Sequence, residues 1–207
     1  MTEDHHIDLN DIERQLDRIR ELADKDEWAE VRGLLVQTRR HLEHLGVTSA
    51  YVLWLSAVAA DKTEQLEDAV GFVTSARDFD HFDPNYIRSE RIVFDNVRKA
   101  MNNQAADGDA RALRLYEILL AHGEADNTSH LSAARCHLSA GNLEAAGKLA
   151  NALVLLSPAC AEAWRLKATL ARRAGNEELA GEMDACAVAS GRSTTGQRAQ
   201  RAGRAQA

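Results

Sequence analysis

The sequence has few of the residues and patterns that typify strand-rich or membrane-spanning proteins. Only 2 of its 207 residues are proline, and aromatic residues make up 5% of the chain. Runs of β-branched residues are scarce, so no segment alternates in the manner of a strand. The longest mainly apolar stretch, Tyr51 to Ala60, is too short to span a bilayer. We therefore expect an all-helical protein without a transmembrane segment.

Cysteine and basic charge are also scarce. The three cysteines cannot all pair and show no CxxC spacing, which favours a reducing compartment. The net charge of −7 argues against bulk binding to nucleic acid. The first residues, MTEDHHIDLND, are acidic and polar, unlike a signal peptide. These features predict a cytoplasmic protein.

Motifs of enzymatic or metal chemistry are missing as well. There is no nucleophile motif, phosphate loop or zinc pattern, and the glycines from Gly191 to Gly203 follow no strand. The best metal candidate is a group of four residues, Asp78, Asp80, His81 and Asp83. As a calcium loop it fails, because its sixth position is an aspartate and its twelfth is Ser89. We interpret this group as a solvated turn with helix-capping aspartates, and we expect no metal, no cofactor and no enzymatic activity.

A second group that could carry chemistry lies on one expected helix. His130 and His137 are two turns apart and share a face, while Cys136 points elsewhere. A zinc or catalytic site would need a third ligand or an orienting acid, and none is in register. We interpret the two histidines as packing residues between helices.

The chain does contain a repeat. Two segments, Asn127–Pro158 and Ala161–Ser190, each read as a helix, a glycine turn and a second helix. Their Gly-Asn pairs and two of their alanines recur at a spacing of 34 residues. Ala100 and Ala112 fit the same register one period earlier. A period of 34 is that of tetratricopeptide repeats.

Individual residues carry this resemblance further. In that family a large residue begins the first helix, small residues line the helix crossing, glycine ends the first helix and proline follows the second. The matching residues are Trp164, Ala134, Ala146, Ala168, Ala180, Gly141, Gly175 and Pro158. The departures are His130, where an aromatic is usual, and Arg192, where a second proline would fall. The chain thus resembles the tetratricopeptide repeat family, which implies a right-handed α-solenoid of about five helical hairpins.

The apolar stripes predict how these hairpins follow one another. The array occupies residues 9–190, with an irregular joint near 77–86 and the clearest repeats at 127–190. Residues 1–8 are expected to be flexible. Residues 191–207 carry four arginines and no acid, and are expected to form a disordered basic tail. The three tryptophans are expected in the core, the Arg39–Arg40 pair on a solvated face, and residues 102–109 in a polar turn.

The resemblance also implies where a partner binds. First helices of the pairs line a concave groove, which here would present Arg135, Arg165, Thr169 and Arg172, extended by Arg98, Met101 and Gln104. Guanidinium groups bind carboxylates bidentately, so these arginines suit an acidic peptide segment, although ordinary solvated arginines would look the same. The carboxylate clamp of heat-shock chaperone adaptors is not matched, because Arg135 and Thr169 stand where lysine and asparagine are needed.

We therefore predict a protein-protein interaction adaptor or scaffold that binds a segment of a partner protein. One alternative is a small chaperone that holds an apolar segment of a secreted or membrane-inserting substrate. Others are an enzyme or metal protein, or a protein whose basic tail touches RNA or anionic lipid. The polarity of the groove and deletion of the tail would separate these functions.

Overall fold

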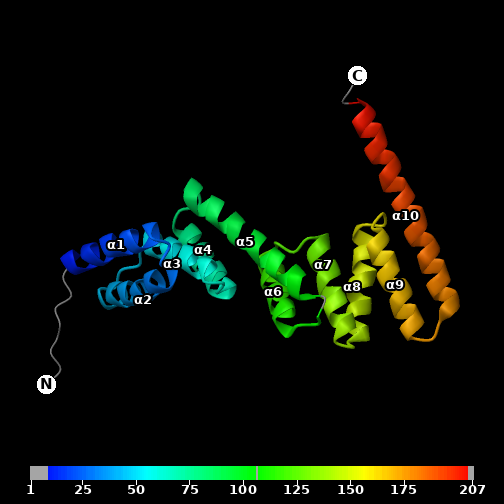
Figure 1. The fold of residues 1–207 in the computed structure, drawn as a ribbon, viewed down its shortest axis with the longest axis horizontal. Coiled ribbons are helices and arrows are strands. Elements are labelled where there is room, and N and C mark those ends of the chain that lie inside the picture. The colour runs from blue at the N-terminus through cyan, green and yellow to red at the C-terminus, as the bar shows by residue number, and fades with distance from the viewer. Residues whose placement is uncertain (1–8, 106, 205–207) are drawn as a thin grey trace. The chain divides into compact units, whose positions relative to one another are not determined.

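The chain consists of consecutive helical hairpins (Figure 1). The computed structural model describes the backbone of residues 9–105 and 107–204 and the side chains of 10–105 and 107–191. These residues form ten helices and no strand: α1 (Leu9–Asp24), α2 (Trp28–His44), α3 (Ala50–Lys62), α4 (Leu66–Phe79), α5 (Pro84–Ala105), α6 (Ala110–Ala121), α7 (Asn127–Ser139), α8 (Leu143–Leu156), α9 (Ala161–Arg173) and α10 (Glu177–Arg204). The predicted all-α fold of five hairpins is confirmed. The expected flexible start, residues 1–8, lies outside the described residues.

Four of the hairpins share one turn. Three residues separate the two helices, and the middle residue has a positive φ in each: Asp26 at 62°, Glu64 at 58°, Gly141 at 80° and Gly175 at 77°. The amide of Gly141 donates to Leu138 O at 3.2 Å, and the next amide donates to His137 O at 2.8 Å. This left-handed ending satisfies the last carbonyls of the first helix and reverses the chain.

The 34-residue period is present in the helices themselves. Helices α7 and α9 each have 13 residues and begin 34 residues apart, and α8 and α10 also begin 34 residues apart. The four alanines expected at the helix crossings, Ala134, Ala146, Ala168 and Ala180, are all 0% exposed. Small residues therefore occupy fully buried positions in both helices of each of these two hairpins.

The chain divides into two compact units, Met1–Val97 and Arg98–Ala207. The core of the first unit joins α1, α2 and α3 through residues such as Ile19, Val31 and Val52. Trp54 Nε1 donates to Ser89 Oγ at 2.9 Å and so ties α3 to the start of α5. The three tryptophans are half-buried at the edges of their cores, not inside them as predicted.

The core of the second unit joins α7, α8 and α9. Leu131, Leu153 and Leu166 pack together there, and Ala150 and Ala163 are 0% exposed. Asp126 caps α7 by accepting from the Ser129 amide at 2.7 Å. Helix α7 and helix α9, the first helices of the last two hairpins, carry most of the expected site residues.

Two boundaries differ from the sequence-based expectation. Helix α5 continues to Ala105, through the first half of the polar turn expected at residues 102–109. The reason is its inner face, because Met101 and Ala105 are 0% and 3% exposed and Asn102 accepts a hydrogen bond from Ser132 at 2.6 Å. Helix α10 likewise continues past Gly191 to Arg204, where a disordered basic tail was expected, and the side chains from residue 192 onward lie outside the described ones.

The irregular joint is a short capped connection. It spans the four residues between Phe79 and Pro84. The Asp80 carboxylate accepts from the amides of Phe82 and Asp83 at 2.9 and 3.2 Å, and the Asp83 carboxylate accepts from Asn85. These aspartates therefore cap the backbone, as the solvated-turn interpretation predicts.

Candidate functional site

Two of the predicted arginines are exposed on neighbouring helices of the second unit. Arg135 lies on α7 and Arg165 on α9, and these two helices contact each other. Thr169 lies one turn after Arg165, where its hydroxyl donates to Arg165 O at 3.0 Å. Thr169 is also the residue 34 positions after Arg135, so the two occupy equivalent places in successive repeats. Within the described residues, neither guanidinium makes a hydrogen bond or an ion pair.

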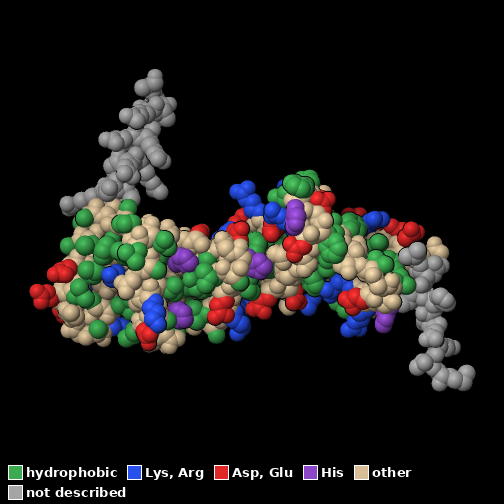
Figure 2. Space-filling view, turned by 180° about the vertical axis from the view of Figure 1, so that it is seen from behind, with side chains coloured by type: hydrophobic (Ala, Val, Ile, Leu, Met, Phe, Trp, Pro, Cys, Tyr) green, Lys and Arg blue, Asp and Glu red, His purple; other side chains and the backbone are tan. Residues whose placement is uncertain are grey.

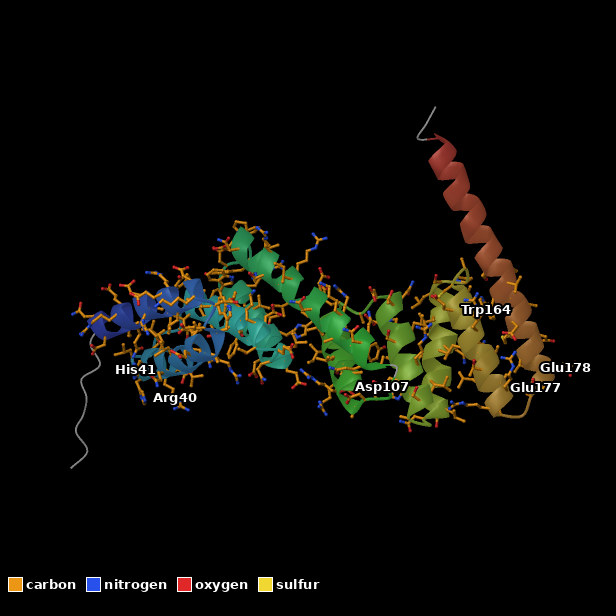
Figure 3. The ribbon with its side chains drawn as sticks, in the orientation of Figure 1. Arg40, His41, Asp107, Trp164, Glu177 and Glu178 are labelled. Carbon is orange, nitrogen blue, oxygen red and sulfur yellow. The ribbon has the colours of Figure 1, made fainter. Side chains whose placement is uncertain are left out.

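A third arginine of the set is engaged within the chain. Arg172 forms an ion pair with Asp184 of α10 and lies 3.9 Å from a carboxylate oxygen of Glu177. Both acids are in α10, whose first turn is labelled at Glu177 and Glu178 in Figure 3. The positive charge of Arg172 is thus already balanced, and a ligand would have to compete for it.

Arg98 holds the loop before α7. It forms an ion pair with the Glu124 carboxylate, and its Nη2 donates to Glu124 O at 3.1 Å. Burial opposes ionisation of Asp126 nearby, but hydrogen bonds from Ser129 and the charge of Arg98 outweigh it, so the pKa of Asp126 is lowered. Arg98 therefore stabilises the cap of α7, and a ligand would have to displace Glu124 to bind it.

Of two further expected groove residues, Met101 is buried and Gln104 is half-buried. Met101 is 0% exposed, so its prediction as a partner-binding residue is wrong. Gln104 Oε1 is buried and has no hydrogen-bond partner among the described residues. Both lie on the face of α5 that packs into the second unit, because the helix runs further than the sequence suggested.

In the histidine and cysteine group on α7, His130 and Cys136 contact other residues of the chain, whereas the buried Nδ1 of His137 has no hydrogen-bond partner among the described residues. His130 Nδ1 lies 2.8 Å from the Tyr116 hydroxyl, and Cys136 Sγ donates to Asp109 O at 3.4 Å. Burial raises the pKa of both Tyr116 and Cys136, which keeps them neutral at ordinary pH. Among the described residues, no three His, Cys, Asp or Glu side chains are grouped in a way that could hold a metal ion.

Basic and acidic side chains are mixed on the surface that is drawn in Figure 2. On the face drawn in Figure 2, the described Lys and Arg side chains are scattered among acidic ones and form no continuous basic patch of the kind that nucleic acid favours. A search of the described helices for a membrane-crossing segment finds none with the necessary length and apolar character.

Sequence reasoning placed Arg39 on a solvated face, and this was wrong. Arg39 is partly buried, and its Cζ lies 4.1 Å from the centroid of the Phe72 ring. The signal was present in the sequence, since Leu35, Arg39 and Leu42 share one face at helical spacing and both leucines are buried. Arg40 is exposed as predicted and is labelled on α2 in Figure 3.

Comparison with known proteins gives distant structural similarity only. No protein-family model and no curated protein matches the chain. Three solved structures are similar over most of their length: "MamA RS-1 ArsTM double mutant" (15% identity, TM-score 0.43, 88% of this chain and 96% of that chain), "MamA 41-end from Desulfovibrio magneticus RS-1" (14%, 0.39, 88% and 96%) and "MamA MSR-1 C2" (14%, 0.42, 87% and 98%). At these TM-scores the similarity carries no functional argument, so function is inferred from the chain's own residues.

Proposed function

We propose that the chain is a non-enzymatic adaptor or scaffold that binds an acidic segment of a partner protein across α7 and α9. The observation that supports this is the pair Arg135 and Arg165, both exposed and without a side-chain partner among the described residues. A guanidinium in this state can take a carboxylate bidentately without breaking an existing bond. Thr169, one turn after Arg165 and equivalent in the repeat to Arg135, adds a hydroxyl that can accept a hydrogen bond.

The spacing of the two helices sets the ligand's pattern. Packed helix axes are about 8–10 Å apart, and an extended peptide advances about 3.3 Å per residue. A peptide crossing α7 and α9 would therefore place acidic side chains at positions i and i+3. Because both arginines are exposed, the affinity should be modest and should fall with salt.

The test uses labelled peptides that carry two glutamates at i and i+3, with a glutamine peptide as the neutral comparison. Anisotropy titrations are run at about 0.05 M and 0.5 M salt, which changes the Debye length from about 14 to 4 Å. We expect binding of the glutamate peptide at low salt, loss of affinity at high salt, and further loss in Arg165→Glu and Arg135→Glu.

The matched control is Arg40→Glu, because Arg40 is an exposed arginine on α2 in the other unit. Equal losses for Arg165→Glu and Arg40→Glu would show that only net charge matters. Tight binding of the glutamine peptide would also refute an acidic ligand.

A second candidate function is the chaperone that holds an apolar segment. It is favoured by Leu155 and Leu156 at the end of α8, which are 82% and 67% exposed. Adjacent exposed leucines are unusual on a soluble surface and suit an apolar partner. Binding of an apolar peptide that is independent of salt and lost in Leu155→Ser with Leu156→Ser would support this function over the acidic adaptor.

A further inference from the structure

The connection between α4 and α5 exposes two of the four phenylalanines of the chain. Phe79, the last residue of α4, is 59% exposed and Phe82 is 90% exposed, whereas Phe94 is buried. Ile87, near the start of α5, is 41% exposed as well. Single apolar residues are ordinary on a protein surface, but large ones gathered in one short segment are typical of interaction sites. Aromatic residues in particular are enriched at the centre of protein interfaces.

The backbone around Phe82 is fixed by hydrogen bonds to carboxylates. The Phe82 amide donates to Asp80 Oδ1 at 2.9 Å, and the Asp83 amide donates to the same oxygen at 3.2 Å. Asp83 Oδ1 in turn accepts from the Asn85 amide at 2.7 Å. Because these bonds already order the turn, covering Phe82 with a partner costs little further backbone entropy.

The charge beside the two rings is negative. The acidic residues of this connection are Asp78, Asp80 and Asp83. Arg77 forms an ion pair with Glu90, so its charge is balanced within the chain, and Arg88 is an exposed cation in the first turns of α5. We call residues 78–83, with their two phenylalanines and three aspartates, the acidic-aromatic turn. A partner that covers its rings would be stabilised by lysines or arginines placed beside an apolar surface.

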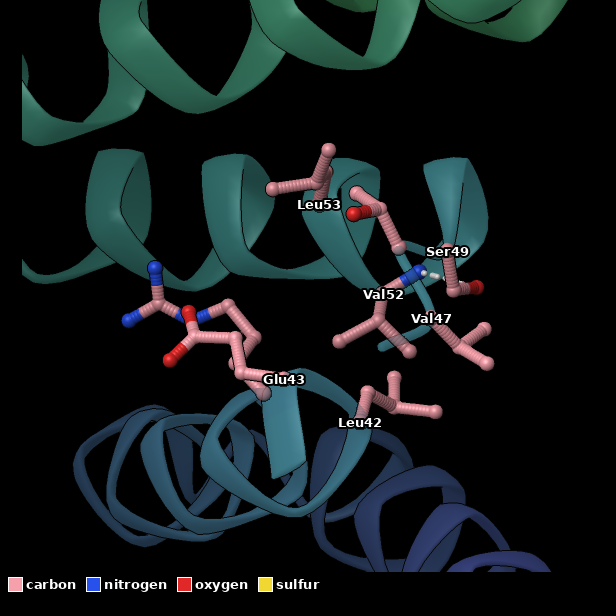
Figure 4. A pocket seen from close by; sticks show the side chains of 8 residues that line it. Leu42, Glu43, Val47, Ser49, Val52 and Leu53 are labelled. Atoms are coloured by element: carbon pink, nitrogen blue, oxygen red, sulfur yellow. Dashed lines mark hydrogen bonds between the residues drawn. The ribbon is translucent and has the colours of Figure 1, made fainter. Parts of the chain in front are cut away.

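Two other ways to cover Phe82 fit less well. Anionic membranes attract basic segments and repel acidic ones, which disfavours a lipid surface. The cavity between the end of α2 and the start of α3 (Figure 4) does not take Phe82 of a second copy. Its volume is about 80 Å³, whereas a benzene ring occupies an apolar cavity of about 150 Å³.

A basic amphipathic helix has the complementary chemistry. Its apolar residues at i, i+3, i+4 and i+7 form a stripe on one face, and four neighbouring side chains of such a helix leave a hole for one large side chain. Phe82 projects far enough to fill a hole of this kind, since nine-tenths of it is exposed. Lysines or arginines along the edges of the stripe would then meet the carboxylates of the turn.

We propose that the acidic-aromatic turn binds a basic amphipathic helix of a partner protein, with Phe82 packed into the apolar stripe and the three aspartates beside its cations. The turn lies within the first unit, so this site does not depend on the acidic-segment site of α7 and α9. The two sites take ligands of opposite charge. A chain with both would join two different partners, which is what a scaffold does.

The test is ¹⁹F NMR of the full chain labelled with 4-fluorophenylalanine, in which each of the four phenylalanines reports separately. Phe72, whose ring lies under the Arg39 guanidinium, and the buried Phe94 are internal controls. One probe is a helical peptide with a leucine stripe flanked by lysines. A second has glutamates in place of the lysines, and a third has serines in place of the leucines. We expect saturable shifts of the Phe79 and Phe82 signals with the lysine–leucine peptide alone, weakening with salt.

Two pairs of variants separate the ring from the charge. Phe82→Ser should weaken binding at least about tenfold, because a buried phenyl ring supplies much of the affinity, whereas Leu120→Ser removes an exposed leucine of the second unit and should change nothing. Asp80→Asn keeps a side-chain acceptor for the turn but removes its charge, so binding should weaken about 1.5-fold to 5-fold. Asp107→Asn, an equal charge change in the second unit (Figure 3), should have no effect.

Several results would overturn the proposal. The absence of saturable shifts at Phe79 and Phe82 would show that the turn binds no such helix. Equal shifts with the serine or the glutamate peptide would remove the role of the leucine stripe or of the cations. Full affinity in Phe82→Ser would remove the anchor. Shifts with phosphatidylcholine vesicles that exceed those with the lysine–leucine peptide would identify the turn as a lipid contact instead.

Discussion

Two glycine-to-alanine changes six residues apart should have opposite effects on stability. Gly141 is the middle residue of the turn after α7, with a φ of +80°, and an added Cβ would meet no atom within 4 Å. Its replacement is therefore opposed by backbone conformation alone. Gly147 lies inside α8, and a Cβ there also meets no atom within 4 Å. Its replacement by alanine should favour the helix.

The magnitudes follow from the two conformations. An L-residue in the left-handed region costs about 1–2 kcal/mol, and the lower entropy of the unfolded alanine chain offsets about 0.4–1 kcal/mol of it. Gly141→Ala should thus lower the free energy of unfolding by about 1 kcal/mol. Gly147→Ala should raise it by about 0.5–1 kcal/mol, the usual difference between glycine and alanine in a helix interior.

Urea denaturation followed by far-ultraviolet circular dichroism measures the difference. The same pair recurs one period later as Gly175 and Gly181, which gives an independent replicate. Both pairs should separate by about 1.5–2 kcal/mol, with the turn variant less stable. A Gly141→Ala protein as stable as Gly147→Ala would refute the left-handed turn as a determinant of the hairpin.

Three further changes test the fold. Ala168→Leu should destabilise by about 1–3 kcal/mol through overpacking, since Ala168 is 0% exposed, and a thermal melt that shows no loss would contradict the helix crossing. Asp126→Ala should cost about 1 kcal/mol at neutral pH through loss of the α7 cap. Because the folded pKa of Asp126 is lowered, this stabilisation is present above the ordinary aspartate pKa of about 4 and is lost as pH falls through the folded value, so denaturation in acid should show a smaller difference. Removal of residues 191–207 should leave the melting temperature nearly unchanged, and a much earlier melt would show that this segment is docked.

The sequence predicted the repeats best where a glycine marks the turn. In the last two hairpins, Gly141 and Gly175 show the period directly. In the first two hairpins the same left-handed position holds Asp26 and Glu64, so the glycine signal is missing although the turn is the same. The backbone hydrogen bonds of the helix end, which no single residue type encodes, carry the geometry there.

Polar residues misled the boundary of α5. Asn102, Asn103 and Gln104 read as a turn, because their side chains favour irregular backbone. The inner face of the helix decides otherwise, since Met101 is buried and Asn102 is bonded to Ser132 of α7. Tertiary contacts of this kind override local propensity, and they also turned an expected groove residue into a core residue.

The candidate site could be predicted only in part. Helical spacing shows which side chains share a face of a helix, but it does not show which of them form ion pairs with other parts of the chain. Arg98 pairs with Glu124, 26 residues later, and Arg172 pairs with Asp184, 12 residues later. Neither partner follows from the repeat pattern. Arg135 and Arg165 have no such partner among the described residues, and this difference could be seen only in the folded chain.

This difference among the arginines leads to a last prediction. Arg172 follows Arg165 by two turns, so the two share a face of α9, but the ion pair with Asp184 holds Arg172. Asp184→Asn should remove the closer of its two acidic partners, leaving a Glu177 oxygen 3.9 Å away, and so make Arg172 more available to the surface that we propose for the acidic segment. Exposed ion pairs contribute about 0.2–1 kcal/mol, so the affinity for the glutamate peptide should rise by about 1.5-fold to 5-fold.

The control for this change is Glu144→Gln, which removes one negative charge at an ion pair on α8, where Glu144 lies 2.7 Å from Lys148. That variant changes the net charge equally but releases a lysine outside α7 and α9, so it should raise the affinity less than Asp184→Asn does. An equal rise in both variants would attribute the gain to net charge. A lower peptide affinity in Asp184→Asn would contradict the prediction. It would mean that the Arg172–Asp184 pair orders α9 for binding, because a pair that only kept Arg172 from the peptide would weaken binding in the unchanged protein.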